Sequence, residues 1–501
     1  MNRMPILLTT DGTYPCYGGG VSVWCDQLIR SLGSFRFHVL AVVSSPSHAP
    51  VFKRPENVVS QQMLPLWGTE EPGALEGDFV STLLSKVRTT SGVIQSRFQD
   101  PFEQCLNAIV RPASSPEGLA EALAALHIYF GEYDYARSMS SPEAWDTFLR
   151  VARDNSPAND RLTLTEAMTC LRWLQRFLAI AAVRLPEAEI VHASMAGLAG
   201  VPGVLHKKLN GTPFLLSEHG IFLRELYLSL ERMHESKRCR RFLFSWFEAV
   251  ARMNYHYADS VSSLCEFNRK WQIRVGAIPE KIRIIPNGID SSLFFPTSAD
   301  TPVTTPTTDS PVVLTMARIY PLKGIDVLLR AARLVLNEMP NVRWRILGEI
   351  GDEAYHRECL QLTDELGIAK SIEWSVTKDP AAAYRAAEVF CLPSISEAMP
   401  YSVLEAMFSG CPVVATQVGG VAEMLGGTGL VVPPKDSSSM ARALLSLLNG
   451  RGADKFRGEL ALKALHRARS LFTLEATTSN FRSQYEQLAR RPAATSMLAG
   501  S

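Results

Sequence analysis

Short apolar segments alternate with helix-forming segments along both halves of the chain, and this alternation limits the fold more than any other feature. In the second half the apolar segments are 312–316, 342–347, 371–374, 389–392 and 413–415, with helical patterns that include 324–338 and 381–387. Strands that alternate with helices form a parallel sheet. The second half is therefore predicted to be a doubly wound α/β domain.

The first half shows the same alternation at its two ends. Its apolar segments are 6–9, 39–43, 190–192, 214–217, 260–263 and 282–285. Between about 68 and 185 the sequence changes to helix-compatible runs of Glu, Ala and Leu, which predict a helical insertion. With 501 residues, the chain is long enough for two such domains, each with its own core.

A stretch rich in Thr, Ser and Pro separates the two halves and has the composition of a linker. We therefore expect a first Rossmann-like domain over 1–295, a linker over 296–311 and a second Rossmann-like domain over 312–473. A final helix is predicted at 474–490.

Composition and charge exclude several classes of protein. Hydrophobic residues make up 46% and charged residues 20% of the chain, as in soluble globular proteins, and a net charge of +1 gives no basic field for nucleic acid. The nine cysteines are scattered without a Cys-x-x-Cys pair, which argues against zinc and indicates reduced thiols in the cytosol. No run of about 18 apolar residues predicts a membrane-spanning helix, and residues 1–10 are expected to form a strand and not a secretory signal.

Two glutamates eight positions apart form the most informative motif. Glu397 follows the apolar segment 389–392. Glu405 lies in a helix that Pro400 can open and Gly410 can close. The motif is thus predicted at the carboxyl end of a strand, where open α/β sheets bind ligands and a helix N-terminus favours an anion.

Two cations, Arg318 and Lys323, are predicted in the loop after the segment 312–316. Such charges can neutralise a diphosphate that leaves without the help of a metal. Considered without the glutamates, they would be solvated charges beside a sheet.

A glycine-dense turn follows the first apolar segment and contains Gly18, Gly19 and Gly20. Without a Cβ atom in the way, the amides of such a turn can approach a phosphate or a sugar closely. Val23 stands where the Gly-x-Gly-x-x-Gly pattern of dinucleotide sites needs its last glycine, which argues against NAD. A plain flexible turn is the alternative.

His219 follows the segment 214–217 and is predicted at the same kind of sheet edge. Its ring could hydrogen-bond a sugar or polarise an acceptor near neutral pH. A histidine at a strand end is also often a structural hydrogen-bond donor, and this alternative stays open.

The spacing of Glu397 and Glu405 resembles the Glu-x7-Glu signature of retaining GT-B glycosyltransferases of family 4. The run Ser-Ile-Ser-Glu-Ala-Met-Pro at 394–400 is especially close to the PelF-type branch, which serves exopolysaccharide synthesis, and Glu-His-Gly-Ile at 218–221 is PelF-like too. The family usually has Gly where this chain has Ala317, a mild departure. The resemblance implies a GT-B architecture of two facing Rossmann-like domains, with the final helix crossing back to the first.

The resemblance also implies roles for individual residues. Glu405 would hold the two ribose hydroxyls of the donor, and Glu397 would face the donor sugar. Arg318 and Lys323 would stabilise the leaving diphosphate, and His219 would contact the sugar or the acceptor. No carboxylate need act as a base, and no metal or other cofactor is expected. Further donor contacts are expected at Gly18, Gly19, Gly20, Met399, Pro400, Tyr401, Ser402 and Val403.

The implied activity is transfer of a sugar from a nucleotide sugar, a UDP-sugar in PelF-like sequences, to a growing glycan or a lipid-linked acceptor in the cytoplasm. A basic run at 237–241 precedes an apolar run at 242–247. Together they could dock at the inner face of a membrane or on a membrane-bound polysaccharide synthase. A helix that buries its apolar side and leaves its cations in water is the alternative.

Other readings of the same residues stay open. Paired carboxylates also occur in glycoside hydrolases, although the two cations would then have no purpose. A GT-B epimerase and a phosphorylase with lysine-bound pyridoxal phosphate would share the fold. A catalytically silent interaction subunit of a synthase complex would share it as well.

Overall fold

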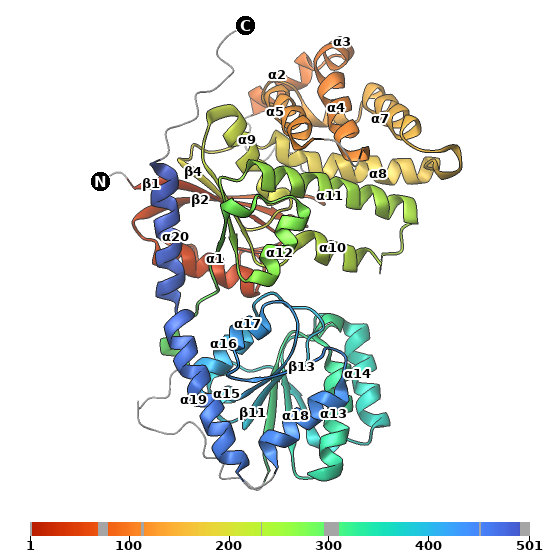
Figure 1. The fold of residues 1–501 in the computed structure, drawn as a ribbon. Coiled ribbons are helices and arrows are strands. Elements are labelled where there is room, and N and C mark those ends of the chain that lie inside the picture. Colours follow the sequence, from red (N-terminus) through yellow and green to blue (C-terminus); the bar gives the residue numbers. More distant parts are fainter. Residues whose placement is uncertain are drawn as a thin grey trace. The chain divides into compact units, whose positions relative to one another are not determined.

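A computed structural model describes residues 3–68, 79–111, 115–231, 233–294, 310–449 and 452–490. The chain forms two compact units (Figure 1). The first comprises Met1–Ser263, Arg269–Ile284 and Phe481–Ser501, and the second comprises Leu264–Asn268 and Ile285–Asn480.

The first unit contains a sheet of seven parallel strands in the order β3-β2-β1-β4-β5-β6-β7. This confirms the predicted doubly wound sheet. The edge strand β3 was not predicted, because Ser60, Gln61 and Gln62 interrupt its apolar pattern. The strands are β1 (Met4–Asp11), β2 (Phe35–Val43), β3 (Val58–Pro65), β4 (Ile190–Ala193), β5 (Phe214–Glu218), β6 (Ser260–Ser263) and β7 (Ile282–Ile284).

Helices cover this sheet, and a further set forms the predicted insertion between β3 and β4 (Figure 1). Ser115 and Ser141 are the N-cap residues of two insertion helices, and each is followed by a proline at the first helical position. This combination is a strong signal for a helix start. The sheet helices are α1 (Gly20–Ser31), α9 (Val201–Asn210), α10 (Phe222–Leu230), α11 (Lys237–Tyr257) and α12 (Glu266–Val275). The insertion contains α2 (Phe79–Arg88), α3 (Ser91–Val93), α4 (Gln99–Val110), α5 (Pro116–Glu132), α6 (Tyr135–Met139), α7 (Pro142–Asp154) and α8 (Leu164–Phe177).

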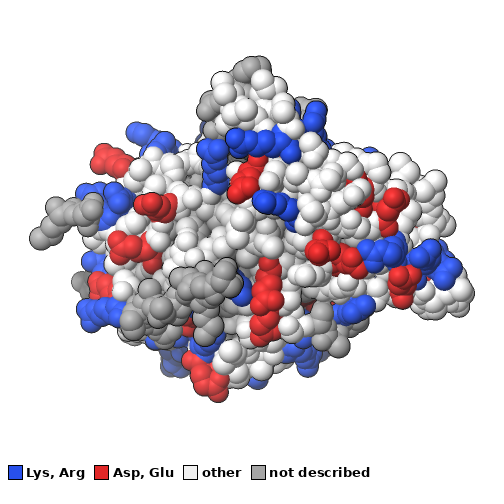
Figure 2. Space-filling view, turned by 90° about the horizontal axis from the view of Figure 1, so that it is seen from above, with Lys and Arg blue, Asp and Glu red and all other residues white. Residues whose placement is uncertain are grey.

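The basic run at 237–241 begins α11 and forms ion pairs with the insertion. Arg238 and Arg241 both form ion pairs with Asp160, at 3.2 and 2.6 Å. Trp246, in the apolar run, is fully buried. These contacts favour a core helix over a membrane-docking helix, and none of the described helices is both long and apolar enough to span a bilayer. Figure 2 shows Lys and Arg interspersed with Asp and Glu on the face seen from above.

The second unit contains six parallel strands in the order β10-β9-β8-β11-β12-β13. In β11, Phe390 and Val389 belong to different hydrophobic clusters, so helices cover both faces of this central strand. The strands are β8 (Val312–Met316), β9 (Arg343–Leu347), β10 (Ile372–Ser375), β11 (Val389–Leu392), β12 (Val413–Thr416) and β13 (Leu430–Val432). The helices are α13 (Ile325–Glu338), α14 (Glu353–Glu365), α15 (Pro380–Arg385), α16 (Tyr401–Phe408), α17 (Val421–Leu425), α18 (Ser437–Leu448) and α19 (Ala453–Leu471).

The second unit begins earlier than the predicted linker, because the chain after β7 already bonds to it. Ile289 donates its amide proton to the carbonyl of Phe472 at 3.1 Å. The predicted linker at 296–311 lies almost wholly outside the described residues. The final helix, α20 (Leu474–Ala489), starts in the second unit and from Phe481 onward belongs to the first.

Candidate functional site

Two loops meet at the carboxyl edge of the second sheet, one after β8 and one after β11. The amide of Ile395 donates a hydrogen bond to the carbonyl of Leu322 at 2.8 Å. Gly324 has a positive φ of 61°, and a Cβ atom there would clash with the carbonyl of Pro393. The two loops are therefore held in register with each other.

This register brings together two of the predicted site residues. Lys323 donates from Nζ to Oε1 of Glu397 in an ion pair, and the side chains are only 18% and 10% exposed. The hydroxyl of Ser394 donates to the same carboxylate oxygen at 2.7 Å. Thr416, at the end of β12, in turn holds the carbonyl of Ser394 at 2.6 Å. A largely buried carboxylate thus has a charged partner, as its desolvation requires.

Glu405 lies in α16 and is held by a residue that the motif did not predict. The hydroxyl of Tyr384, in α15, donates to Oε2 of Glu405 at 2.8 Å. Burial raises the pKa of Glu405, and the hydrogen bond from Tyr384 opposes that rise. Because Tyr384 itself is fully buried, it fixes the direction in which the carboxylate points.

The start of α16 matches the prediction in place but not in every side chain. Pro400 is the N-cap residue, and Tyr401 and Ser402 are partly exposed in the first turn. Met399 and Val403 point into the core, and the amide of Val403 already donates to the carbonyl of Pro400 at 3.2 Å. The side chains of Met399 and Val403 are therefore turned away from a donor, and the amide of Val403 is already bonded within the helix.

Arg318 is the other predicted cation of this loop, and its side chain is exposed. Its guanidinium forms no hydrogen bond or ion pair with the residues that the structure describes. The side chain lies against Gly351, where a Cβ atom would come within 2.6 Å of Nε. Because Gly351 has no side chain, the side chain of Arg318 can lie along the sheet edge, where its guanidinium is accessible to an anion.

Gly419 and Gly420, after β12, complete this edge and were not predicted as site residues. Gly419 has a φ of +53°, and a Cβ atom there would clash with the carbonyl of Glu397. The amide of Gly420 donates to the carbonyl of Ala398 at 2.7 Å. The only sequence signal is a pair of glycines that comes two residues after a buried strand.

In the first unit, the predicted glycine turn leads from β1 into α1, which begins at Gly20. All three glycines are exposed, and Gly19 has a φ of +145°. A Cβ atom at Gly18 or Gly19 would meet nothing within 4 Å. Packing therefore does not require Gly18 or Gly19, and the two leave open space before the first amides of α1.

His219 directly follows β5 and packs its ring against Trp24 of α1, with ring centroids 4.2 Å apart. Glu218, its neighbour, has no predicted role but is buried, and it accepts hydrogen bonds from the hydroxyl of Tyr255 and the amide of Phe222. Burial raises the pKa of Glu218 to about 7. Burial likewise raises the pKa of Asp11, at the end of β1, to about 6. The carboxyl edge of the first sheet thus carries protonatable groups that the motifs did not reveal.

The predicted site residues therefore form two sets, one on each unit. Gly18, Gly19, Gly20 and His219 lie in the first, and Arg318, Lys323, Glu397, Glu405 and the start of α16 lie in the second. In the described part of the chain, no group of three or more His, Cys, Asp or Glu side chains is arranged to hold a metal ion.

Comparison with known families assigns both halves of the chain. Residues 4–280 match the family described as "Domain of unknown function (DUF3492)", and residues 310–450 match the family described as "Glycosyl transferases group 1".

Among its relatives is the D-inositol 3-phosphate glycosyltransferase of Kribbella flavida, 31% identical over 227 residues, which cover 43% of this chain and 54% of that protein. The enzyme of the same name from Acidothermus cellulolyticus is 34% identical over 205 residues, which cover 37% of this chain and 45% of that protein. The chain thus spans about half the length of the curated relatives that it matches.

Solved structures share the fold over nearly the whole chain. A sucrose-phosphate synthase from Thermosynechococcus elongatus has a TM-score of 0.61 at 19% identity, covering 97% of this chain and 99% of that one. Anabaena HepE in complex with UDP has a TM-score of 0.60 at 15% identity, covering 97% and 100%. Two Rossmann-like domains with parallel sheets of seven and six strands match the GT-B fold, as predicted. Since the first family match covers more than half of the 501 residues, the chain belongs to the family described as "Domain of unknown function (DUF3492)" and carries a glycosyl transferases group 1 domain after it.

Proposed function

We propose that this chain is a retaining glycosyltransferase that moves a sugar from a nucleotide-sugar donor to a growing glycan or a lipid-linked acceptor. The observation that carries the proposal is the edge of the second sheet. There Lys323 and Glu397 are paired on loops held in register, and Arg318 stands exposed on the same loop as Lys323. Paired acids and cations at the carboxyl edge of a parallel sheet suit a ligand with a sugar at one end and a diphosphate in the middle.

The proposed chemistry depends on the placement of charge. Breaking the bond between sugar and diphosphate leaves added negative charge on the phosphate oxygens. Arg318 and Lys323 would neutralise this charge, and amides at the start of α16 would add dipole stabilisation. Glu397 would orient the sugar, and Glu405 would hold the ribose hydroxyls. In a retaining reaction of this type the acceptor oxygen attacks from the face that the phosphate leaves, and the departing phosphate oxygen accepts its proton.

The donor in this proposal is a UDP-sugar, and the biological role is exopolysaccharide synthesis of the PelF type. The motifs at 394–400 and 218–221 support this branch by resemblance. HepE was solved with UDP-glucose, which makes that sugar the first donor to test. We place the reaction in the cytoplasm, because nine free and buried cysteines suit a reducing compartment.

The direct test is a panel of UDP-, GDP- and ADP-sugars, screened first by thermal shift and then by nucleotide release with glycan acceptors. Donor-dependent release of UDP, with the anomeric configuration kept in the product, is the expected result. Inversion of the configuration would contradict retention. The same rate after treatment with EDTA is expected, since the two cations and not a metal supply the counter-charge.

Two other functions give different results in this panel. A silent interaction subunit would bind a nucleotide sugar and release no nucleotide with any acceptor. A GT-B epimerase would convert the donor sugar without an acceptor, which mass spectrometry and sugar analysis of the donor would detect. The exposed Arg318 and the paired Lys323 favour the transferase over the silent subunit, because each charged group of the motif is present and placed at one sheet edge.

A further inference from the structure

Three helices of the first unit enclose a groove that plays no part in the proposed donor site. Its cavity measures about 560 Å³, within the range of small-molecule sites. One wall comes from α10, one from α11 and one from α12. The side chains that define it are Arg224, Tyr227, Phe244, Arg252, Trp271 and Arg274.

The groove combines exposed aromatic rings with cations. Tyr227 is 56% exposed, and its ring stands edge-on to that of Phe244 with the centroids 6.2 Å apart. The guanidinium of Arg274 lies 4.8 Å from the ring centroid of Trp271. Aromatic rings grouped in a concave surface are a feature of ligand-binding grooves.

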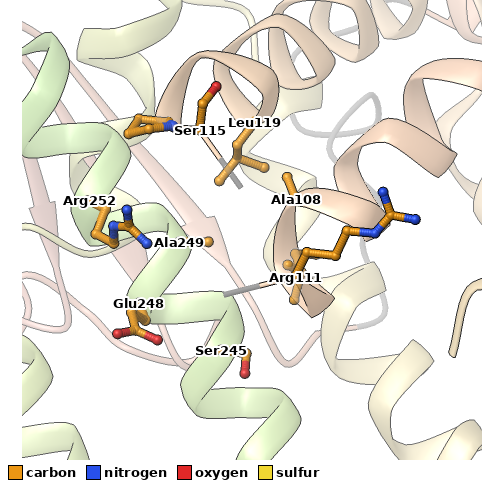
Figure 3. Close-up of a pocket in the computed structure, with 10 residues that line it drawn as sticks. Ala108, Arg111, Ser115, Leu119, Ser245, Glu248, Ala249 and Arg252 are labelled. Atoms are coloured by element: carbon orange, nitrogen blue, oxygen red, sulfur yellow. The ribbon is translucent and has the colours of Figure 1, made fainter. Parts of the chain in front are cut away.

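The charge of the groove is uneven. Among the described residues that line it are three arginines and one carboxylate, that of Glu248. Glu248 and Arg252 also line a smaller cavity of about 20 Å³ on another side of α11, room for about one water molecule (Figure 3). In this close-up the two residues follow each other along α11, and Arg111 stands on the opposite wall. The larger groove is therefore the ligand-sized one, and its excess of guanidinium groups favours an anion.

The groove also begins close to the loop that carries His219. Leu223 and Arg224 line it from the first turn of α10, and that helix starts directly after the loop that carries His219. A chain of sugars that leaves this loop along α10 would enter the groove.

We propose that this groove binds an anionic segment of the acceptor glycan, such as a run of uronate residues. The aromatic rings of Tyr227 and Trp271 would stack on pyranose faces, and the guanidinium groups would pair with the sugar carboxylates. A site of this volume suits a short oligosaccharide, whereas a protein partner needs a far larger contact of about 800 Å² per side. The inference deepens the proposed transferase function, on which its biological meaning rests.

The test is direct binding of tetragalacturonate to the full chain, measured by isothermal titration calorimetry without any donor. Maltotetraose, which is neutral and of the same length, is the comparison ligand. We expect binding of the uronate that weakens as salt rises, and weaker binding of maltotetraose. Tyr227→Ala and Arg274→Ala should each reduce the affinity for the uronate about tenfold.

Two matched variants control for the loss of an exposed aromatic and of an exposed arginine. Trp67→Ala removes a ring that is 46% exposed outside the groove, and Arg330→Ala removes an exposed arginine of α13. Both should keep the affinity of the unchanged protein, and thermal unfolding should show that all four variants are folded.

Several results would overturn the inference. These are an absence of tetragalacturonate binding at millimolar concentration, equal binding of maltotetraose, or an equal loss in the control variants. Tyr227-dependent flotation with phosphatidylglycerol vesicles, without uronate binding, would make the groove a lipid site instead. Uronate binding without nucleotide release would leave the groove in place and remove the transferase. Nucleotide release with neutral acceptors alone, without uronate binding, would support the transferase and rule out the groove as a uronate site.

Discussion

Lys323 and Glu397 neutralise each other at the edge of the second sheet, and both side chains are largely buried. The pair joins two loops that lie 74 positions apart in the sequence. An arriving diphosphate would compete with Glu397 for the ammonium group, because both are anions. In the proposed function, the pair would therefore couple the binding of the donor to the position of the carboxylate that would face its sugar.

Replacing Lys323 with Ala should slow transfer strongly. The variant removes one preorganised cation from the leaving diphosphate, which by analogy with the loss of one oxyanion donor raises the barrier by about 2.7–4 kcal/mol, or about 10²–10³ in kcat. It also leaves Glu397 with a neutral partner, Ser394. Steady-state rates with saturating donor measure the effect.

Lys378→Ala is the matched control, because Lys378 is exposed in the same unit. It should keep the full rate. A full rate in Lys323→Ala would mean that this lysine does not act on the leaving group. A double-mutant cycle with Glu397→Gln separates loss of the ion pair from loss of the contact with the diphosphate.

Replacing Tyr384 with Phe should weaken donor binding with little effect on turnover. The variant keeps the buried ring and removes only the hydrogen bond that holds Glu405. Ribose contacts are alike in the ground and transition states, so we expect KM for the donor to rise about fivefold, or about 1 kcal/mol, at unchanged kcat. A fall in kcat at unchanged KM would contradict the role given to Glu405.

Much of the fold could be predicted from the alternation of strands and helices. The predicted segments 312–316, 389–392 and 260–263 coincide with β8, β11 and β6, because these strands are short, apolar and bounded by clear breaks. The missed strands, β3 and β13, lie at sheet edges, where half of each strand faces water and the apolar signal is weak.

The sequence could predict which residues belong to the candidate site, but not which of their side chains contact each other. The sequence predicted Glu397 and Lys323 in loops that each follow a strand, but it could not show that the two side chains meet, since that depends on the strand order and on the register between the loops. Tyr384 was missed because it lies 21 positions from Glu405 and in a different helix. Glu218 was part of a quoted motif, but the motif does not show that the residue is buried, and burial is what raises its pKa. The hydrogen bonds that partly oppose this rise come from Tyr255 of α11 and Gln272 of α12, which lie 37 and 54 positions further along the chain.

Replacing Gly419 with Ala should lower the transfer rate by more than the loss of fold stability would explain. Gly419 and Gly367 both have a positive φ, at 53° and 65°, so each replacement strains the main chain by about 1 kcal/mol. A Cβ atom at Gly419 would also clash with the carbonyl of Glu397, whereas at Gly367 it would meet nothing within 4 Å. Transfer rates should therefore fall at least tenfold for Gly419→Ala and stay normal for Gly367→Ala. Equal rates in the two variants would show that the approach of Gly419 to Glu397 does not matter for activity.

Glu218 should make the stability of the first unit depend on pH. Its pKa is raised from 4.5 to about 7, so below pH 4.5 the carboxyl is protonated in both the folded and the unfolded chain. Between pH 4.5 and 7 the unfolded chain gives up this proton and the folded chain keeps it, so the free energy of unfolding falls by up to about 3 kcal/mol as pH rises.

The lowered pKa of His192 acts in the opposite direction, and it is common to the unchanged protein and to Glu218→Gln. We therefore expect the difference in unfolding free energy between the two proteins to shift in favour of Glu218→Gln from pH 5 to pH 8. Urea unfolding at several pH values, with the exposed Glu231→Gln as the control for net charge, measures this difference. A difference that does not change with pH would show that Glu218 is ionised in the folded protein throughout this range.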